Sequence, residues 1–372
     1  MAYFEEQRRD LAELAARTRA RRLTERAGRD FSSNDYLALA GNPALAAAVR
    51  AALDAGVPIG SGGSRLLRGN HAEHERLEAA AARFFGSESA LYFSTGYAAN
   101  AALLSTLPQR GDLIVYDALV HASAHEGMRL SRAEVRGAAH NDPQAFEDAI
   151  AGWRRGGGTG RVWIAVESLY SMDGDRAPLD ALAAIADRHE AVLLVDEAHA
   201  TGVFGPEGRG LAAGLAGREN LITLHTCGKA LGCEGALLCA PRVVRDFLVN
   251  RGRAFIFSTA PSPLMAVAVE AALGLIAEPE RRARLHALIE RAQALLAPLG
   301  VTATGSQILP LVLGDDARTM AMAADLQRLG FDVRGIRPPT VPAGTSRLRI
   351  SLTLNVGEAD LAALADALRS LA

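Results

Sequence analysis

The sequence predicts an α/β protein, in which a large domain with a mostly parallel central sheet and helices on both faces precedes a smaller C-terminal α+β domain. From about residue 72, short apolar runs alternate with Ala-rich helical stretches, which is the pattern of βαβ units. The apolar runs are continuous instead of alternating with polar residues, as expected for strands that are buried on both faces. After residue 260 this alternation stops, and a long helical stretch leads into a different order of elements.

Six runs are the predicted strands of the large domain: "ALYFS", "DLIVYD", "VWIAVES", "AVLLVDEAHA", "NLITLHT" and "GALLCA". Helices between them include "PQAFEDAIAGWRR" and "LDALAAIADRHE". The C-terminal part predicts a helix over roughly 264–297, then "ILPLVLG", a helix, "FDVRGI", "SRLRISLTL" and a last helix. We therefore expect an N-terminal helix and arm over 1–45, the large domain over 46–260 and the small domain over 261–372.

The composition excludes several classes of protein. The 372 residues are 49% hydrophobic and 22% charged with a net charge of −2, so no global field attracts nucleic acid or an acidic membrane. No apolar run approaches the ~20 residues of a membrane span. The charged start "MAYFEEQRRDLAEL" lacks an apolar signal core, and three cysteines are an odd number, so we expect a cytoplasmic protein with reduced thiols. Their spacing fits no common zinc site, and we expect no metal.

Polar and ionisable residues follow three successive predicted strands. In an open α/β sheet, ligands bind outside the carboxyl ends of the strands. The residues delivered to this edge are Glu167, Ser171, Asp196, His199, Thr226 and Lys229. This convergence is the first indication of a site.

Lys229 is the only lysine among the 40 lysines and arginines of the chain. An amine can lose its proton and form a Schiff base, whereas a guanidinium with a pKa above 12 cannot. Gly228 and Gly232 permit a close approach of the backbone to a ligand. Imine chemistry at Lys229 is one interpretation, and chance survival of a single lysine is the other.

Pyridoxal phosphate needs a lysine, an acid for its pyridine nitrogen and a cradle for its phosphate. Asp196 can hold the nitrogen, although an Asp at a strand end is also a common turn or cap residue. The segment "STGY", with Thr95, Gly96 and Tyr97, follows a strand and would bind phosphate at a helix N-terminus or simply cap that helix. His199 could bond the phenolic oxygen, Thr226 and Thr259 could add hydroxyls, and His121 could stack on the ring or be structural.

Rival motifs are weaker. "GSGGSR" lacks the third glycine of a dinucleotide loop and follows no strand. "CGKA" is not a P-loop, and "DEAH" has no phosphate-binding lysine loop to accompany it as a helicase box. His121 and His125 stand four residues apart without a carboxylate ligand pattern.

The chain resembles the α-oxoamine synthases, pyridoxal-phosphate enzymes of the fold-type I aminotransferase class. The resemblance covers nearly the whole chain and is carried by "FSSNDYLALA", "GSGGSRLLRGN", "STGYAAN", "HASAHEG", "ESLYSMDGDRAPL", "DEAHATGVFGPEGRG", "HTCGKALG" and "FIFSTAPSP". It implies that Lys229 is the Schiff-base lysine, and that Asp196, His199 and His121 contact the pyridine nitrogen, the phenolic oxygen and the ring. It also implies cofactor contacts from Ser171, Thr226 and the amides of Gly96 and Tyr97, and a homodimer in which Thr259 reaches the partner's phosphate.

The segment "GIRPPTVPAGTSRLRISLT" is similar to the biotin-pathway branch of the family. That branch condenses L-alanine with pimeloyl-CoA or pimeloyl-acyl carrier protein and releases carbon dioxide. The resemblance implies that Asn34 and Arg349 hold the amino-acid carboxylate, and we expect Arg337, with Arg21 or Arg22, to face the acyl chain. The alternatives are another amino-acid acyltransferase, such as glycine C-acetyltransferase, and a catalytically silent partner subunit. The chain departs from the family in a short segment before "SSNDYL" and in an acid, Glu234, just past the lysine loop.

Overall fold

The computed structural model describes residues 3–371, which divide by their contacts into two units. Unit 1 comprises residues 1–36, 172–175 and 283–372, and unit 2 comprises 37–171 and 176–282. The sequence-based division at 45 and 260 differs from this one. Helix α10 (Pro263–Ala277) belongs to unit 2 because it packs against α2 (Pro43–Asp54) and α3 (Ala72–Phe85).

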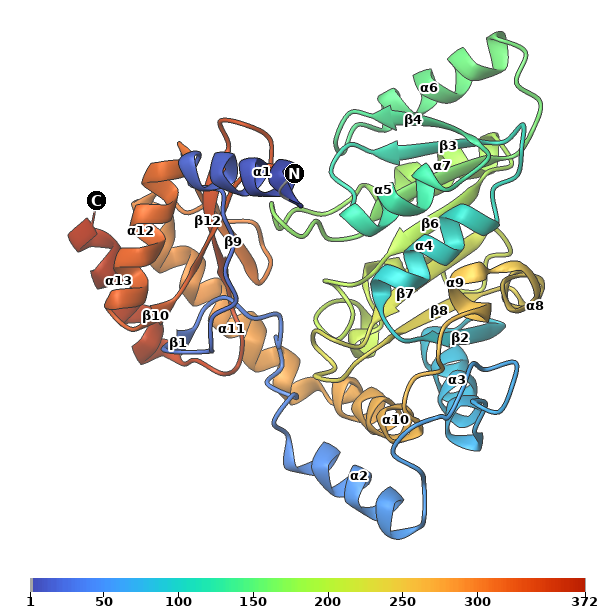
Figure 1. The fold of residues 1–372 in the computed structure, drawn as a ribbon, viewed down its shortest axis with the longest axis horizontal. Coiled ribbons are helices and arrows are strands. Elements are labelled where there is room, and N and C mark those ends of the chain that lie inside the picture. Colours follow the sequence, from blue (N-terminus) through green and yellow to red (C-terminus); the bar gives the residue numbers. More distant parts are fainter. Residues whose placement is uncertain (1–2, 372) are drawn as a thin grey trace. The chain divides into compact units, whose positions relative to one another are not determined.

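Unit 2 contains a seven-stranded sheet in the order β2-β8-β7-β6-β5-β3-β4 (Figure 1). The strands are β2 (Ser89–Phe93), β3 (Leu113–Asp117), β4 (Glu134–Ala138), β5 (Val162–Glu167), β6 (Val192–Asp196), β7 (Leu221–Thr226) and β8 (Ala236–Ala240). Only β8 runs antiparallel to its neighbours, so the expected mostly parallel sheet is confirmed. The sequence analysis missed β4, because this edge strand is largely exposed and carries charged residues in place of an apolar run.

Helices cover both faces of this sheet (Figure 1). One apolar core lies between one face of the sheet and the helices α4 (Gly96–Thr106), α5 (Ala122–Arg129), α8 (Arg242–Arg251) and α9 (Arg253–Ile256). The other lies against α6 (Pro143–Arg155) and α7 (Leu179–Arg188). Alternate residues of one strand enter different cores, as Ile114 and Leu113 do, which explains why the strands read as unbroken apolar runs.

Unit 1 contains the three-stranded antiparallel sheet β11-β12-β9, a short parallel pair β1-β10 and the helices of the C-terminal part. Its elements are α1 (Glu5–Ala16), β1 (Arg29–Asp30), α11 (Pro279–Leu296) from residue 283 on, β9 (Ile308–Gly314), α12 (Asp316–Arg328), β10 (Phe331–Asp332), β11 (Arg334–Ile336), β12 (Ser346–Ser351) and α13 (Glu358–Leu371). The expected single helix over 264–297 is wrong: α10 and α11 are separate, because Pro279 cannot continue α10 as an interior helix residue.

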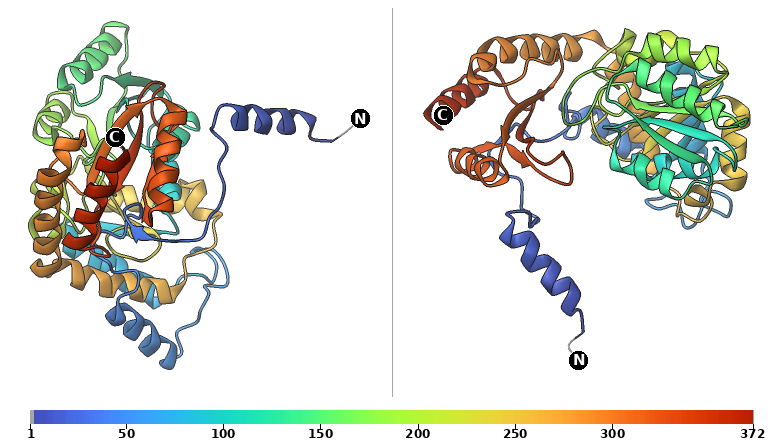
Figure 2. Two further views of the ribbon diagram at one scale, coloured as in Figure 1. Left: turned by 90° about the vertical axis from the view of Figure 1, so that its left-hand side faces the viewer. Right: turned by 90° about the horizontal axis from the view of Figure 1, so that it is seen from above.

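The N-terminal arm is extended. Helix α1 has no buried residue, and the chain between it and β1 runs as an extended segment (Figure 2). Among residues 3–371, no helix is both long enough and apolar enough to cross a membrane.

Candidate functional site

A cavity of about 190 Å³ in unit 2 lies at the carboxyl ends of β5, β6 and β7. Eight of the predicted site residues line it: Gly96, Tyr97, His121, Glu167, Asp196, His199, Thr226 and Lys229. They come from five different segments of the chain, and of the residues that the carboxyl-edge argument names, Glu167, Asp196, His199, Thr226 and Lys229 line the cavity, whereas Ser171 does not. Asn100, Ser123, Ala198 and Leu224 complete the wall.

Lys229 lies on a tight loop between β7 and β8. The amide of Cys227 donates to the carbonyl of Gly235 at 2.8 Å, and the amide of Gly232 donates to the carbonyl of Lys229 at 2.9 Å. Gly232 has φ +64°, and a Cβ there would collide with the backbone of Ala40. The glycine is therefore required both by its conformation and by this close approach, and it fixes the loop that carries the lysine.

The N-terminus of α4 faces the cavity through Gly96 and Tyr97. Thr95 is the N-cap, and its hydroxyl accepts a hydrogen bond from the amide of Ala98 at 3.0 Å. A Cβ at Gly96 would lie 3.6 Å from Oγ1 of Thr226, so the hydroxyl of Thr226 is close to this helix end. Exposed amides and the positive end of the helix dipole make this corner suited to a phosphate group.

The Asp196 carboxylate is held from two sides. Its Oδ1 accepts the amide of Ala198 at 2.9 Å, and its Oδ2 accepts Nδ2 of Asn100 at 2.8 Å. Glu167 lies beside it in register on the neighbouring strand. Burial, and secondly the Asp196 carboxylate, raise the pKa of Glu167 well above its ordinary value, which favours the protonated acid.

The next residue along the chain, Glu197, anchors this strand end. Its buried carboxylate accepts hydrogen bonds from Oγ of Ser168 at 2.8 Å, from the amide of Leu211 at 3.0 Å and from the amide of Ala212. Burial raises its pKa to about 7. The sequence analysis did not select Glu197, nor Asn100 or Ser123. Asn100 stands four residues after Gly96, a spacing that places both on one helix face and could have indicated it.

Two features of the cavity suit pyridoxal phosphate. Oε1 of Glu167 is buried, lines the cavity and has no hydrogen-bond partner among the described residues. The backbone amides at Gly96, the amine of Lys229 and the carboxylate of Asp196 lie in the same cavity. These are the three kinds of group that bind the phosphate, the aldehyde and the ring nitrogen of this cofactor. Within residues 3–371, no group of three or more His, Cys, Asp or Glu side chains is placed to hold a metal ion.

The remaining predicted residues lie outside this cavity wall. Ser171 is buried, and its amide donates to the carboxyl of Glu167. Thr259 is exposed, just after α9. Asn34 and Arg349 belong to unit 1, where Nη2 of Arg349 donates to Oδ1 of Asn34 at 3.1 Å.

A groove of about 560 Å³ in unit 1 is lined by Arg21, Arg22, Arg334 and Arg337. Arg337 is 9% exposed, and its Nη2 donates to the carbonyl of Ala20 at 2.7 Å, while its Nε is buried without a partner among the described residues. Burial, with the nearby Arg21 guanidinium, lowers the pKa of Arg337. The structure thus brings Arg21 and Arg337 together in one cationic groove, as the sequence analysis paired them.

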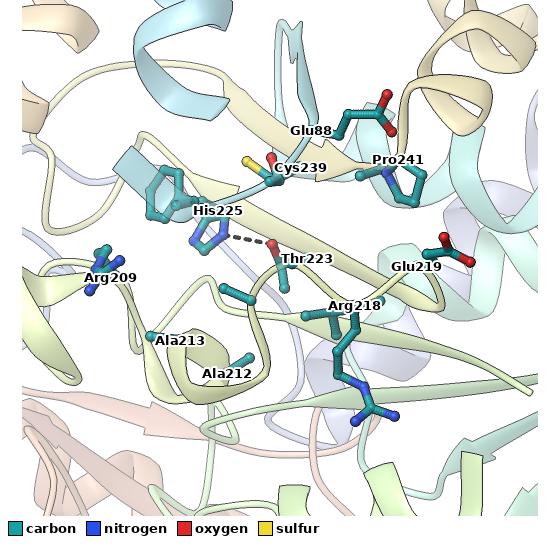
Figure 3. Close-up of a pocket in the computed structure, with 17 residues that line it drawn as sticks. Glu88, Arg209, Ala212, Ala213, Arg218, Glu219, Thr223, His225, Cys239 and Pro241 are labelled. Atoms are coloured by element: carbon teal, nitrogen blue, oxygen red, sulfur yellow. Dashed lines mark hydrogen bonds between the residues drawn. The ribbon is translucent and has the colours of Figure 1, made fainter. Parts of the chain in front are cut away.

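A second hollow of unit 2, of about 90 Å³, lies at the opposite edge of the sheet, beside the first residue of β7 and the last of β8 (Figure 3). At its floor His225 stacks on Phe85, with ring centroids 3.6 Å apart. The two ring nitrogens of His225 bond Oγ1 of Thr201 at 2.8 Å and Oγ1 of Thr223 at 2.9 Å. Both ring nitrogens of His225 are therefore occupied by hydrogen bonds within the fold.

Acidification should destabilise the protein through His225. Burial lowers the pKa of this histidine to about 3, whereas an unfolded histidine titrates near 6.5. Between these values the unfolded chain binds the extra proton, so the stability contributed by the neutral ring falls as the pH falls from about 6.5 to about 3. In urea unfolding at equal protein concentration, His225→Phe should reduce the slope of stability against pH by about 1.4 kcal/mol per pH unit. His286→Phe on α11 is the control, and an unchanged slope in His225→Phe would contradict the assignment.

Known proteins are similar in sequence to most of the chain. Residues 28–368 match the family model of class I and II aminotransferases. The chain is 47% identical over 330 residues to the 8-amino-7-oxononanoate synthase of Anaeromyxobacter dehalogenans, covering 87% of this chain and 81% of that protein. It is also 47% identical over 349 residues to the synthase of the same name from Burkholderia thailandensis, covering 91% and 87%.

Solved structures are similar over nearly the whole chain. A serine palmitoyltransferase from S. paucimobilis with bound pyridoxal phosphate and myriocin has a TM-score of 0.88 at 27% identity, covering 99% of this chain and 97% of that one. An 8-amino-7-oxononanoate synthase from Francisella tularensis has a TM-score of 0.77 at 27% identity, covering 92% and 97%.

The chain therefore belongs to the class I and II aminotransferase family, as an enzyme of the fold-type I class whose cofactor is pyridoxal 5′-phosphate. Within that class its relatives group it with the 8-amino-7-oxononanoate synthases, which makes it a pyridoxal-phosphate-dependent acyltransferase.

Proposed function

We propose that this enzyme condenses L-alanine with a pimeloyl thioester, with loss of carbon dioxide, to form 8-amino-7-oxononanoate in biotin synthesis. The observation that carries the proposal is the joint placement of Lys229, Asp196, His121 and His199 on one cavity in a chain 47% identical to synthases of that name. The serine palmitoyltransferase likeness is at 27% identity, so a long acyl chain with serine is the less favoured reading.

The residues of the cavity would hold the cofactor from all sides. The amides of Gly96 and Tyr97 and the hydroxyl of Thr226 would bind its phosphate, with Thr259 of a second subunit. Asp196 would bond the ring nitrogen, His199 the phenolic oxygen, and His121 would pack on the ring. When bound, pyridoxal phosphate supplies an electron sink for the α-carbon of the amino acid.

Lys229 would be the residue that bonds the cofactor and then acts as the base. Its amine can bond the cofactor's aldehyde and, once displaced by alanine, can accept the α-proton at Nζ. Asp196 would keep the ring nitrogen protonated by its negative charge, which stabilises the charge that develops as this proton leaves. Asn34 and Arg349 would bind the carboxylate of alanine, since a guanidinium can hold a carboxylate with two hydrogen bonds.

The arginine groove of unit 1 would bind the far carboxylate of the pimeloyl chain. Arg21, Arg22 and Arg337 line it, and within residues 3–371 none of these three forms an ion pair with a carboxylate. Arg19 and Arg334 nearby are paired, with Asp316 at 2.8 Å and Asp332 at 2.7 Å. An anion is therefore the ligand that this groove favours electrostatically. Coenzyme A and acyl carrier protein are both possible carriers of the chain.

Replacing Arg337 by alanine should lower kcat/KM for pimeloyl thioester by roughly 30-fold or more, since losing one member of the buried charged pair that Arg337 would form with the far carboxylate would cost about 2–5 kcal/mol. Exchange of the α-proton of alanine in D2O should be unchanged. The ratio of kcat/KM for pimeloyl thioester to that for an uncharged thioester of equal chain length should become smaller. Arg328→Ala is the matched control, because Arg328 pairs locally with Asp325 on an exposed face of α12. Equal losses with both thioesters would make Arg337 a structural residue.

A homodimer is the proposed assembly. Large apolar side chains are exposed around one loop of unit 2, with Ile59 76%, Leu67 80% and Phe257 72% exposed. The loop is fixed in place, because Oγ of Ser61 donates to the carbonyl of Ala260 at 2.7 Å. An exposed apolar group of this kind is typical of a subunit interface. None of the three cysteines, Cys227, Cys233 and Cys239, is in a disulfide, which fits a reducing cytoplasm.

Turnover of a panel of thioesters tests the proposal. Pimeloyl-CoA and pimeloyl-acyl carrier protein with alanine should give the highest kcat/KM among pairs that include acetyl, succinyl and palmitoyl thioesters with alanine, glycine or serine. A higher value for acetyl-CoA with glycine, or for palmitoyl-CoA with serine, would assign the chain to another branch.

A further inference from the structure

Asn100 connects two groups of the cofactor cavity that belong to different elements. It lies on α4 and is 6% exposed. Its Nδ2 donates to Oδ2 of Asp196 at 2.8 Å and to Oγ of Ser123 at 3.0 Å. An amide nitrogen carries two hydrogens, so both of its donors are used in these two bonds.

Ser123 passes the connection to His121. Its Oγ lies 2.8 Å from Nδ1 of His121, and its backbone amide donates to the same Nδ1 at 3.2 Å. A backbone amide can only donate, so Nδ1 is an acceptor and the neutral ring carries its proton on Nε2. Since Oγ of Ser123 accepts from Asn100, its own hydrogen is directed toward Nδ1.

We propose that Asn100 and Ser123 are positioning residues that hold the Asp196 carboxylate in place and keep His121 neutral with its proton on Nε2. This inference rests on the proposed contacts of Asp196 and His121 with the cofactor. It adds a relay of three hydrogen bonds, from Asp196 through Asn100 and Ser123 to His121, that sets the charge and tautomer of the groups on either end.

The charges around His121 explain why its state matters. The titratable groups around it are Asp196 at the end of β6, Glu167 at the end of β5, Lys229 after β7 and His125 on α5, and Tyr97 and His199 line the same cavity. Desolvation lowers the pKa of His121, Asp196 opposes this shift, and Lys229 and His125 add to it. A protonated His121 would compete for the negative charge of Asp196, whereas a neutral ring leaves that charge to the ring nitrogen of the cofactor.

Nitrogen-15 NMR of histidine-labelled enzyme, in both the cofactor-bound and cofactor-free forms, tests the relay. The signals of His121 are assigned by their loss in His121→Asn. In the wild type they should report one tautomer, protonated on Nε2. In Ser123→Ala the pKa of His121 should rise, because the hydroxyl bond that favours the neutral form is lost. The backbone amide of residue 123 is retained, so the neutral ring should keep its proton on Nε2. Asn100→Ala should also raise this pKa and weaken cofactor binding by roughly 10-fold.

Ser105→Ala is the matched control, since Ser105 lies on the same helix and its hydroxyl donates only within it, to the carbonyls of Ala101 and Ala102. An unchanged pKa of His121 in Ser123→Ala would overturn the relay, and so would an equal change in Ser105→Ala. Ser123→Ala decides the question if Asn100→Ala does not fold. Failure of the proposed cofactor contacts has a different signature, because the signals of wild-type His121 would then be the same in the cofactor-bound and cofactor-free forms, while failure of the relay alone leaves their response to the cofactor intact.

Discussion

Replacing Lys229 by arginine is expected to abolish turnover, with a loss of roughly 10³-fold or more, since general acid–base catalysis alone contributes about 10²–10⁴-fold. Arginine keeps the positive charge but cannot supply a neutral amine. The variant should still fold and still bind pyridoxal phosphate through the α4 N-terminus and Asp196, but without a covalent bond. The measurements are kcat and mass spectrometry after borohydride reduction.

The single lysine makes this test clean, because only the α-amino group competes for the aldehyde. Arg242→Lys, which places a second lysine on an exposed position, is the control and should not be labelled stoichiometrically. If borohydride reduction of the wild type leaves no pyridoxyl group on the peptide that contains Lys229, the mechanism is contradicted.

Replacing Asp196 by asparagine should lower turnover by ~10²-fold or more, since electrostatic groups that act on developing charge contribute about 2.7–4 kcal/mol. A neutral amide cannot keep the ring nitrogen protonated, so removal of the α-proton should slow while the covalent bond to Lys229 still forms. Exchange of the α-proton of alanine in D2O, followed by proton NMR, measures that step directly.

Asp187→Asn is the matched control, because it removes a carboxylate that pairs with Arg218 on an exposed part of the same unit. It should leave the exchange rate unchanged. Near-normal exchange and turnover in Asp196→Asn would show that this carboxylate does not act on the cofactor ring.

The parallel sheet was predictable because strands that are buried on both faces consist of unbroken runs of apolar residues. "VWIAV" and "VLLV" contain no polar residue at all, and both are central strands. The edge strand β4 has no such apolar run, since "EVRGA" is mostly exposed and its pairing with β3 depends on the backbone. The break between α10 and α11 could have been read from Pro279.

The cavity residues were predictable where a strand end delivers them, as with Asp196 and Lys229. Asn100 and Ser123 were not, because their importance depends on which atoms they meet across elements: Asn100 bonds a residue 96 positions away and Ser123 one 23 positions away. The segment carrying Arg337 could be selected by its similarity to the biotin-pathway branch, but the contact of Arg337 with Ala20, 317 positions earlier, follows only from the folded unit.

The central claim is a decarboxylative condensation, and carbon dioxide release from carboxyl-labelled L-alanine tests it most directly. With purified enzyme and pimeloyl thioester, one labelled carbon dioxide should appear for each free thiol and each 8-amino-7-oxononanoate formed, and none without the thioester. Release of thiol with the label retained in the organic product, or conversion of alanine to pyruvate without carbon dioxide, would contradict the account.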